Sequence, residues 1–274
     1  MDNRAIGVFD SGLGGLTATQ ELKNLLPDEH IIYLGDSYNM PYGEKNKTQI
    51  IEMSLNDLAF LLARDVKAVF VACGTATSNA LEALMQSSPV PVFGVVEPAV
   101  LEAINSTNSG KIGLLATRAS IQSGTYQRLL NEISPNVIVT AQACPKFATM
   151  VEYGIFDKAD ERVLKAVSEY LPPLKQAGVD TVILGCTHYP LLADVISDYM
   201  GKDVKLISAG AAAARKLSEN LRENNLTCNG CDSKTEYYTT GSTASFARTA
   251  ELMLKHDISP FLLGIAPFDK GSNI

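Results

Sequence analysis

The feature that most constrains this fold is a short internal repeat, in which two strand endings occur in the same order in both halves of the chain. Residues Ala5–Ser11 resemble Lys111–Thr117, since each apolar run ends in a hydroxyl residue just before an expected helix. Further along, Val69–Thr75 resembles Val182–His188, and in both segments the apolar run leads to a cysteine. The repeat predicts two similar structural units, each with one thiol at the end of a buried strand.

Between these endings, short apolar runs rich in Val and Ile alternate with longer amphipathic segments. This alternation is typical of parallel strands joined by crossover helices, so the predicted class is α/β. Thr48–Arg64 has helical period, and the helical pattern of Asp157–Ala177 is interrupted near its end by Pro172 and Pro173. We expect strands at Ala5–Phe9, Ile31–Gly35, Ala68–Ala72, Val92–Val95, Lys111–Ala116, Val137–Ala141, Thr181–Gly185, Val204–Ile207 and Glu236–Thr239.

Ligands bind at the carboxyl ends of the strands in open parallel sheets. Two units that face one another would therefore bring Cys73 and Cys186 to opposite walls of one cleft. That arrangement suggests a reaction that acts on both faces of its substrate. A boundary between the units is expected near Pro98, and the residues after Ser208 are expected to return to the first unit.

Composition limits the partners that the chain can have. Its 274 residues are 46% hydrophobic and 19% charged, which predicts a substantial core and not disorder. The formal net charge of −7 and the scattered Lys and Arg residues argue against a nucleic-acid surface. No apolar run approaches membrane-spanning length, and the start of the chain lacks a signal-peptide pattern. We expect a soluble cytoplasmic protein with a small-molecule partner, and no regulatory segment before the first strand.

The five cysteines are Cys73, Cys144, Cys186, Cys228 and Cys231, and this odd number fits reduced thiols better than a disulfide framework. The pair Cys228 and Cys231 resembles half of a metal knuckle or a redox pair, but no second pair completes a zinc site. We interpret this segment as a surface loop and expect no metal site.

Cys73 is followed by Gly-Thr and Cys186 by Thr-His, so each thiol is expected beside unpaired backbone N–H groups at the start of a helix. Such a setting lowers the pKa of a thiol and also binds a carboxylate. Asp10 ends the first strand and His188 follows Cys186 closely, so each is a candidate to pass or stabilise a proton. Plainer alternatives stay open: cysteine is a common core residue, Asp10 is a possible helix N-cap, and His188 a possible backbone partner.

The glycine-rich turn Ser11–Leu16 does not fit a nucleotide site. Thr17 stands where the fingerprint needs a third glycine, and Asp10 would repel phosphate. The glycines instead allow the backbone to approach a small ligand, or simply make a tight turn. Pro41-Tyr42-Gly43 follows the second strand, either on the ligand side or as a plain loop.

Thiols, hydroxyls and backbone amides, with almost no Lys or Arg among them, suit a small zwitterion that carries carboxylates. Removing the α-proton of an amino acid without a pyridoxal lysine motif requires desolvation and aligned hydrogen-bond donors. Two thiols on opposite faces would explain inversion, because one removes a proton while the other donates one from the far side.

Several motifs carry a resemblance to the glutamate racemases: Asp10-Ser11-Gly12, Asp36 with Pro41-Tyr42-Gly43, Cys73-Gly74-Thr75-Ala76-Thr77, Val96-Glu97-Pro98-Ala99, Leu184-Gly185-Cys186-Thr187-His188-Tyr189-Pro190 and Thr239-Thr240-Gly241-Ser242. They span essentially the whole chain. The resemblance implies two pseudosymmetric parallel-sheet α/β domains, residues 1–97 plus 208–274 and residues 98–207, with the active site in the cleft between them. It also implies a homodimer and the cofactor-independent interconversion of L- and D-glutamate for peptidoglycan.

The same resemblance implies roles for individual residues. Cys73 and Cys186 would be the catalytic pair, with Cys73 on the D-glutamate side. Asp10 would assist Cys73, while His188 and Glu152 would assist Cys186. The implied substrate contacts are Asp10, Ser11, Tyr42, Gly43, Gly74, Thr75, Thr117, Thr187 and His188.

One position departs from the family pattern, which has Asn-Thr after the first cysteine where this chain has Gly74-Thr75. Losing a hydrogen bond from that amide to a carboxylate costs about 1.5–3 kcal/mol, or roughly ten- to hundred-fold in rate. Gly74→Asn is therefore expected to raise activity. Three alternatives remain: a racemase for another acidic amino acid such as aspartate, a weakly active or non-catalytic amino-acid-binding relative, and a thiol hydrolase with one essential cysteine.

Overall fold

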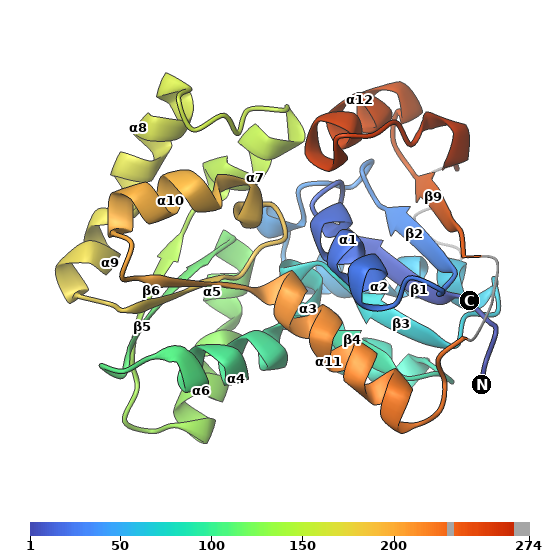
Figure 1. The fold of residues 1–274 in the computed structure, drawn as a ribbon, viewed down its shortest axis with the longest axis horizontal. Helices are drawn as coiled ribbons and strands as arrows, with labels where there is room; N and C mark the ends of the chain where they lie inside the picture. Colours follow the sequence, from blue (N-terminus) through green and yellow to red (C-terminus); the bar gives the residue numbers. More distant parts are fainter. Residues whose placement is uncertain (229–232, 266–274) are drawn as a thin grey trace.

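The computed structural model describes residues 1–228 and 233–265, and in this part the chain forms two parallel sheets that lie side by side (Figure 1). The first sheet has six strands in the order β10-β9-β2-β1-β3-β4, and the second has four in the order β6-β5-β7-β8. Every strand pair is parallel. The strands are β1 Ile6–Asp10, β2 Ile31–Gly35, β3 Ala68–Val71, β4 Val92–Gly94, β5 Lys111–Ala116, β6 Ile138–Ala143, β7 Thr181–Leu184, β8 Lys205–Ser208, β9 Thr235–Thr239 and β10 Leu262–Gly264.

The predicted α/β class with two parallel sheets is confirmed. Each expected strand is present with ends within two residues of the expected ones. Strand β10 was not predicted, because Leu262–Gly264 is too short to show a pattern of its own.

Helices cover the sheets and connect their strands, as the crossover pattern predicts. The α-helices are α1 Gly15–Leu25, α2 Lys47–Leu62, α3 Gly74–Ser87, α4 Val96–Ser106, α5 Arg118–Ser123, α6 Thr125–Ile133, α7 Pro145–Glu152, α8 Glu161–Tyr170, α9 Pro172–Ala177, α10 Ala193–Met200, α11 Ala209–Glu223 and α12 Thr243–Leu254. Three short 3₁₀ helices are η1 Tyr42–Glu44, η2 Tyr189–Leu192 and η3 Ser259–Phe261. None of the helices in the described residues is long and apolar enough to cross a membrane.

Local sequence explains two of the helix boundaries. Helix α2 begins at Lys47 because Asn46 and Gln49 form a capping box, in which each side chain accepts a hydrogen bond from the other residue's backbone N–H. The predicted helix over residues 157–177 is split in two, since α8 ends at Tyr170 and α9 begins at Pro172. Proline lacks a backbone N–H and therefore starts a helix readily but interrupts one that is under way.

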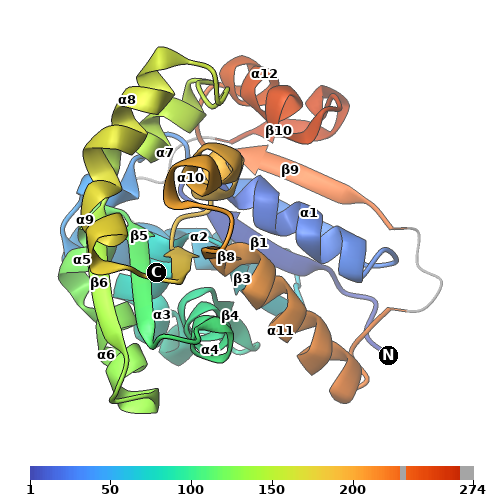
Figure 2. The ribbon, with the colours of Figure 1, turned by 60° about the vertical axis from the view of Figure 1, so that its left-hand side comes forward.

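One of the three clusters of buried hydrophobic side chains joins the two sheets. A single cluster of buried side chains includes Val8 and Phe70 from the first sheet and Leu114 and Ile183 from the second. Helix α11 packs against α1 and also against α4, which itself contacts β7 and β8 of the second sheet. It therefore lies between the two sheets (Figure 2). The strands of the first sheet come from residues 6–94 and 235–264, and those of the second from residues 111–208. This distribution supports the proposed domains, residues 1–97 plus 208–274 and residues 98–207.

A buried ion pair ties together four segments that lie far apart in the sequence. Lys67 is 2% exposed, and its ammonium donates to Glu29 Oε2 at 2.6 Å and to the backbone oxygens of Asp2 and Leu226, each at 2.8 Å. Glu29 Oε1 also accepts a hydrogen bond of 2.8 Å from the backbone N–H of Cys228. Because an ammonium has three donors, the charge of Lys67 is fully hydrogen-bonded without water.

We expect Lys67→Met to lower the free energy of unfolding by about 3–5 kcal/mol, because it leaves the carboxylate of Glu29 buried without its cation. Equilibrium unfolding in urea measures this loss. The exposed pair of Arg128 and Glu132 provides the control, since Arg128→Met should cost under about 1 kcal/mol. Equal losses in the two variants would show that burial of the Lys67 pair has no such effect.

Candidate active site

The two repeated strand endings place Cys73 and Cys186 beside one cavity of about 650 Å³. Cys73 follows β3 and is the N-cap of α3, whereas Cys186 follows β7 after Gly185. Both side chains are buried, with 4% and 7% of their surfaces exposed, and both line the cavity. The repeat in the sequence therefore corresponds to two thiols from two different sheets at a single site.

The cavity wall contains most of the residues that the sequence analysis singled out. Besides the cysteines these are Ser11, Tyr42, Gly43, Thr75, Thr117, Glu152, Thr187 and His188. Thr75 Oγ1 lies 2.8 Å from Thr117 Oγ1, so hydroxyls from the two halves of the chain meet there. Asp10 and Gly74 are not part of the wall: Asp10 is fully buried, and Gly74 lies against the backbone oxygen of Gly185.

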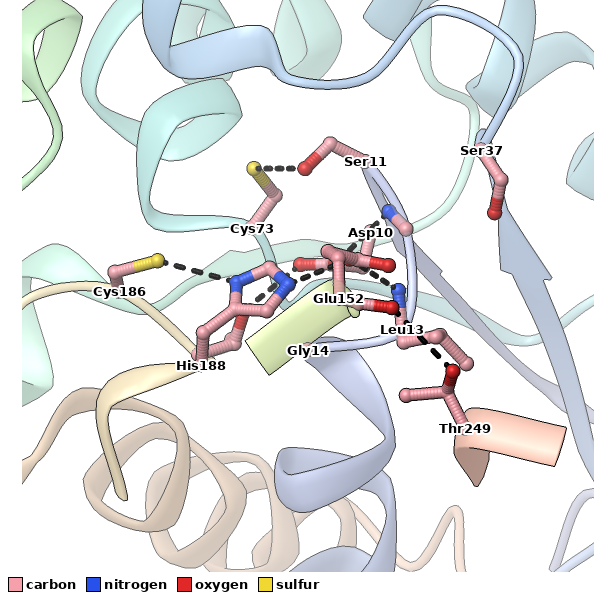
Figure 3. A network of polar contacts seen from close by, with 12 residues as sticks. Asp10, Ser11, Leu13, Gly14, Ser37, Cys73, Glu152, Cys186, His188 and Thr249 are labelled. Carbon is pink, nitrogen blue, oxygen red and sulfur yellow. Dashed lines mark hydrogen bonds and ion pairs between the residues drawn. The ribbon is translucent and has the colours of Figure 1, made fainter. Parts of the chain in front are cut away.

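Cys186 stands at one end of a line of charged groups. Its Sγ is 3.3 Å from His188 Nδ1, and His188 Nε2 is 2.6 Å from Glu152 Oε1 (Figure 3). Glu152 Oε1 also accepts a hydrogen bond of 2.9 Å from the backbone N–H of Leu13. Burial lowers the pKa of His188, but the adjacent Cys186 and Glu152 outweigh burial and raise this pKa well above 6.5. A protonated His188 donates from both ring nitrogens, so it can bond the sulfur of Cys186 and the carboxylate of Glu152 at the same time.

Cys73 has only weak hydrogen-bond partners. Its Sγ accepts a bond of 3.4 Å from the backbone N–H of Ala76 and lies 3.6 Å from Ser11 Oγ (Figure 3). Burial and the charge of Asp10 raise the pKa of Cys73 to about 12. The expectation that the helix start lowers this pKa was wrong, because the desolvation of a fully buried sulfur outweighs one or two backbone N–H groups.

Asp10 joins the two halves of the chain. Its Oδ1 accepts a 3.0 Å hydrogen bond from the backbone N–H of Gly12, and its Oδ2 accepts one of 3.0 Å from Thr187 Oγ1. Burial raises the pKa of this carboxyl, against the opposing effect of His188. Asp10 does not cap α1, whose N-cap is Gly14, so the plainer interpretation of this residue was wrong.

The structure adds an outer wall that sequence reasoning missed. Helices α7 and α8 contribute residues on the far side of the cavity from α3, among them Pro145, Lys146, Ala148, Thr149, Met150, Arg162, Lys165, Ala166 and Glu169. Apart from Met150, which belongs to the segment Met150-Val151-Glu152-Tyr153-Gly154 that resembles the family pattern around Glu152, these residues form no motif, and they come from two helices that pack against each other.

A second feature missed in the sequence is the group of buried carboxyls that holds Tyr42. The phenol oxygen of Tyr42 lies 2.6 Å from Asp36 Oδ2 and 3.0 Å from Asp57 Oδ2. Asp36 also accepts hydrogen bonds from Thr240 Oγ1 at 2.6 Å and from Asn39 Nδ2 at 2.9 Å. The side chain of Tyr42 is thus fixed where the residue lines the cavity.

Counting hydrogens assigns the proton in this group. A phenol has one hydrogen, so Tyr42 donates to one carboxyl and needs a donor from the other. Asp36 accepts from two further donors, whereas Asp57 Oδ1 is buried and has no hydrogen-bond partner in the described residues. Asp57 therefore carries the proton and donates it to Tyr42. Burial and the charge of Asp36 raise the pKa of Asp57 well above its ordinary value, in agreement with this count.

Cys144 and Cys228 belong to the described residues but are not part of the cavity wall. Cys144 is a buried free thiol, as are Cys73 and Cys186. Cys228 is buried and disulfide-bonded, so the expectation of a surface loop with reduced thiols was wrong for this residue. Cys231 lies outside the described residues. Within residues 1–228 and 233–265, no group of three His, Cys, Asp or Glu side chains is placed to hold a metal ion.

Two parallel sheets, each of which places one cysteine beside the same cavity, are the combination by which the family of this protein can be recognised. The family model of Asp/Glu/hydantoin racemases matches residues 6–217, a range that contains both thiols, and the chain belongs to this family. The chain is similar in sequence to glutamate racemases. The glutamate racemase of Lactococcus lactis is 45% identical to it over 257 residues, which cover 93% of each chain. The structure of glutamate racemase isoform RacE1 from Bacillus anthracis superposes with a TM-score of 0.93 at 38% identity, over 98% of this chain and 100% of that one. The Francisella tularensis glutamate racemase in complex with D-glutamate has a TM-score of 0.90 at 32% identity, over 97% and 99%.

The assignment of the proton to Asp57 predicts opposite outcomes for two similar substitutions. Asp57→Asn should change the free energy of unfolding by less than about 1 kcal/mol at pH 4, because an amide still donates to Tyr42. Asp36→Asn should cost about 3 kcal/mol, since a charged acceptor of three hydrogen bonds is lost. Urea unfolding of both variants distinguishes them.

The pH dependence follows from the same raised pKa. As pH rises above about 4, the unfolded chain loses the Asp57 proton while the folded chain keeps it, so the stability from this group declines. Asp57→Asn removes that decline, and the variant should gain stability relative to the wild type between pH 4 and pH 8. A constant difference over this range would place the proton elsewhere.

Proposed function

We propose that this chain interconverts L-glutamate and D-glutamate by moving the α-proton between two thiols on opposite sides of the cavity. The observation that carries the proposal is the unequal environment of the two cysteines. Cys186 Sγ lies 3.3 Å from Nδ1 of His188, whose pKa is raised well above 6.5, whereas burial raises the pKa of Cys73 to about 12. One thiol is thus prepared as a base and the other as an acid, which is what inversion at one carbon requires.

The reaction then follows from the positions of the groups. The Cys186 thiolate takes the α-proton of L-glutamate, and the pair of electrons from the C–H bond stays on the α-carbon and its carboxylate. The Cys73 thiol gives its proton to the opposite face of that carbon, which yields D-glutamate and leaves Cys73 as a thiolate. The reverse reaction begins from this second state, with Cys73 as the base on the D-glutamate side.

Positioning residues divide between the two thiols in this scheme. His188, held by Glu152, stabilises the charge on Cys186. Asp10 and Ser11 serve the Cys73 side, where Ser11 Oγ lies 3.6 Å from the sulfur and Asp10 attracts the substrate ammonium. The proposed contacts to the substrate are Asp10, Ser11, Tyr42, Gly43, Gly74, Thr75, Thr117, Thr187 and His188.

Backbone N–H groups at the start of α3 supply the charge stabilisation that deprotonation of an amino acid needs. The first N–H groups of a helix have no partner within the helix and attract a carboxylate. The hydroxyls of Thr75 and Thr117 lie beside them on the cavity wall. Aligned donors of this kind stabilise the negative charge that develops when the α-proton leaves, so the proposed chemistry uses no cofactor.

Glutamate is preferred to aspartate as the substrate, because the similar relatives are glutamate racemases and one of them binds D-glutamate in its structure. A hydrolase with a single essential cysteine would leave the second thiol without a role. We further propose that the product supplies D-glutamate for peptidoglycan in the cytoplasm, and that the chain acts as a homodimer.

Incubation of the purified protein with L-glutamate in deuterated water should yield D-glutamate that carries deuterium at the α-carbon, as mass spectrometry and chiral chromatography measure. Cys73→Ser and Cys186→Ser should each lower the rate of racemisation by several orders of magnitude, because each removes one of the two proton carriers.

Cys144→Ala provides the matched control, since Cys144 is a buried free thiol outside the cavity wall. It should retain racemisation near the wild-type rate. Near-normal turnover by either serine variant would reject the two-thiol mechanism, and absence of exchange with glutamate and aspartate in the wild type would reject the proposed function altogether.

The two thiols should also differ in their reaction with iodoacetamide. At pH 8 a thiol with a pKa of about 12 is ionised in roughly one molecule in ten thousand, so Cys73 should be alkylated much more slowly than Cys186. The rate at Cys73 should rise about tenfold for each further pH unit until it approaches pH 12, as peptide mass spectrometry can follow. Faster alkylation of Cys73 than of Cys186 would contradict the assigned charges.

A further inference from the structure

The glycine-rich turn after β1 meets the second half of the chain directly. A Cβ at Gly12 would collide with Oε1 of Glu152, so the missing side chain at this position leaves room for a carboxylate of the protein itself. Glu152 is the last residue of α7, and its Oε1 accepts the hydrogen bond of 2.9 Å from the backbone N–H of Leu13 (Figure 3). One backbone N–H of the first half thus holds a charged side chain of the second.

The peptide group between Gly12 and Leu13 is held from both sides. The hydroxyl of Tyr33, a residue of β2, donates to the Gly12 oxygen at 2.7 Å, while the N–H of Leu13 donates to Glu152. This peptide bond is trans. The C=O and the N–H of a planar trans peptide point in opposite directions, so a group that orients one of them also orients the other. Tyr33 therefore sets the direction in which the N–H of Leu13 points.

This peptide group needs such a hold because of the glycine beside it. Glycine lacks the Cβ that restricts backbone rotation, so the peptide between Gly12 and Leu13 can turn while the flanking Cα atoms stay in place. Turning would point the N–H of Leu13 away from Glu152. It would also break the bond from Tyr33, whose side chain is fully buried, and no water could replace the lost acceptor.

The carboxylate that the turn holds leads on to one of the two thiols. Glu152 Oε1 lies 2.6 Å from His188 Nε2, and His188 Nδ1 lies 3.3 Å from Cys186 Sγ. The side chain of Glu152 is only 9% exposed, so solvent is a poor substitute for the N–H of Leu13. A continuous series of polar contacts therefore connects Tyr33 of the first sheet with Cys186, which follows a strand of the second.

We propose that Tyr33 is a positioning residue for Cys186, because its hydroxyl orients the peptide whose N–H fixes the carboxylate of Glu152 beside His188. The inference rests on the proposed function, since it assigns Tyr33 to the Cys186 side of the two-thiol reaction. Tyr33 is not part of the cavity wall, so it acts through the turn and not on the substrate.

Tyr33→Phe is the sharpest test because it removes only the hydroxyl. The ring can keep its packing against Tyr237 and Phe246, whose centroids lie 6.3 Å and 6.4 Å away. Glu152 then loses its fixed donor and holds His188 less firmly. We expect the rate of racemisation to fall by about ten- to hundredfold, which corresponds to the loss of one hydrogen bond to a charged group.

The decisive readout compares the two thiols of the same molecule by their rates of alkylation with iodoacetamide at pH 8. In Tyr33→Phe the reaction of Cys186 should slow by about tenfold, because its thiolate loses support from His188. The rate at Cys73 should stay unchanged, since the N–H of Gly12 belongs to the preceding peptide and keeps its bond to Asp10. A variant that is merely loosened would instead expose both thiols and speed both reactions.

Tyr237→Phe is the matched control, because it removes a hydroxyl from the ring that packs against Tyr33 in the same hydrophobic cluster. It should keep the wild-type ratio of the two alkylation rates even if it is less stable. A double substitution tests the route. In a Glu152→Ala background, Tyr33→Phe should have no further effect on Cys186, and a full additional effect would show that Tyr33 does not act through this carboxylate.

The outcomes separate this inference from the proposed function. If the wild type racemises glutamate and Tyr33→Phe keeps both its rate and its alkylation ratio, the positioning role is overturned. If the wild type does not racemise, the proposed function fails, whereas the alkylation ratio still reports whether Tyr33 acts on Cys186. Should Tyr33→Phe not fold, a crystal structure of the wild type decides. An N–H of Leu13 that points away from Glu152 would overturn the role, and one that points to it, with Tyr33 bonded to the Gly12 oxygen, would support it.

Discussion

The carboxyl ends of the strands of two parallel sheets meet at one cavity. The rest of the site depends on how the sheets are held so that these two edges face each other. Parallel strands end at the same edge of a sheet, so each sheet alone presents a single functional edge. A reaction on two faces of one carbon needs two such edges opposite one another. The shared core with Val8, Phe70, Leu114 and Ile183 holds the sheets in that orientation, and hydrogen bonds such as that from Thr187 to Asp10 join their edges.

Similar strand endings do not give the two thiols similar chemistry. Cys186 is followed by His188, whose other ring nitrogen is held by a carboxylate from α7, and this supports negative charge on the sulfur. Cys73 has comparable burial and bonds to a backbone N–H and a hydroxyl, and burial together with the charge of Asp10 raises its pKa. The asymmetry between the two thiols thus begins with His188, whose counterpart in the repeat is Thr75, and Glu152 of α7, an element outside the repeat, holds that histidine.

The sequence predicted the features that depend on periodicity and on local motifs. Parallel strands, the split of the 157–177 helix at Pro172 and the meeting of Cys73 with Cys186 all follow from patterns within a few residues. The parts that it missed depend on tertiary packing: the pairing of Asp57 with Tyr42, the wall from α7 and α8, and the raised pKa of Cys73. Gly74 is a further example, because the sequence could not show that this residue lies against the backbone oxygen of Gly185.

The hydrogen bonds of Lys67 have a consequence for the order in which the chain acquires its structure during synthesis. One of its three acceptors is the backbone oxygen of Leu226, which lies 159 positions later in the chain, and Glu29 bonds Cys228, which lies 199 positions later than Glu29. While only the early strands have been synthesised, the ammonium of Lys67 therefore lacks one of its three acceptors. The second sheet, whose strands all lie between residues 111 and 208, can be complete before the first one closes. The half that begins the chain is therefore the last to be finished.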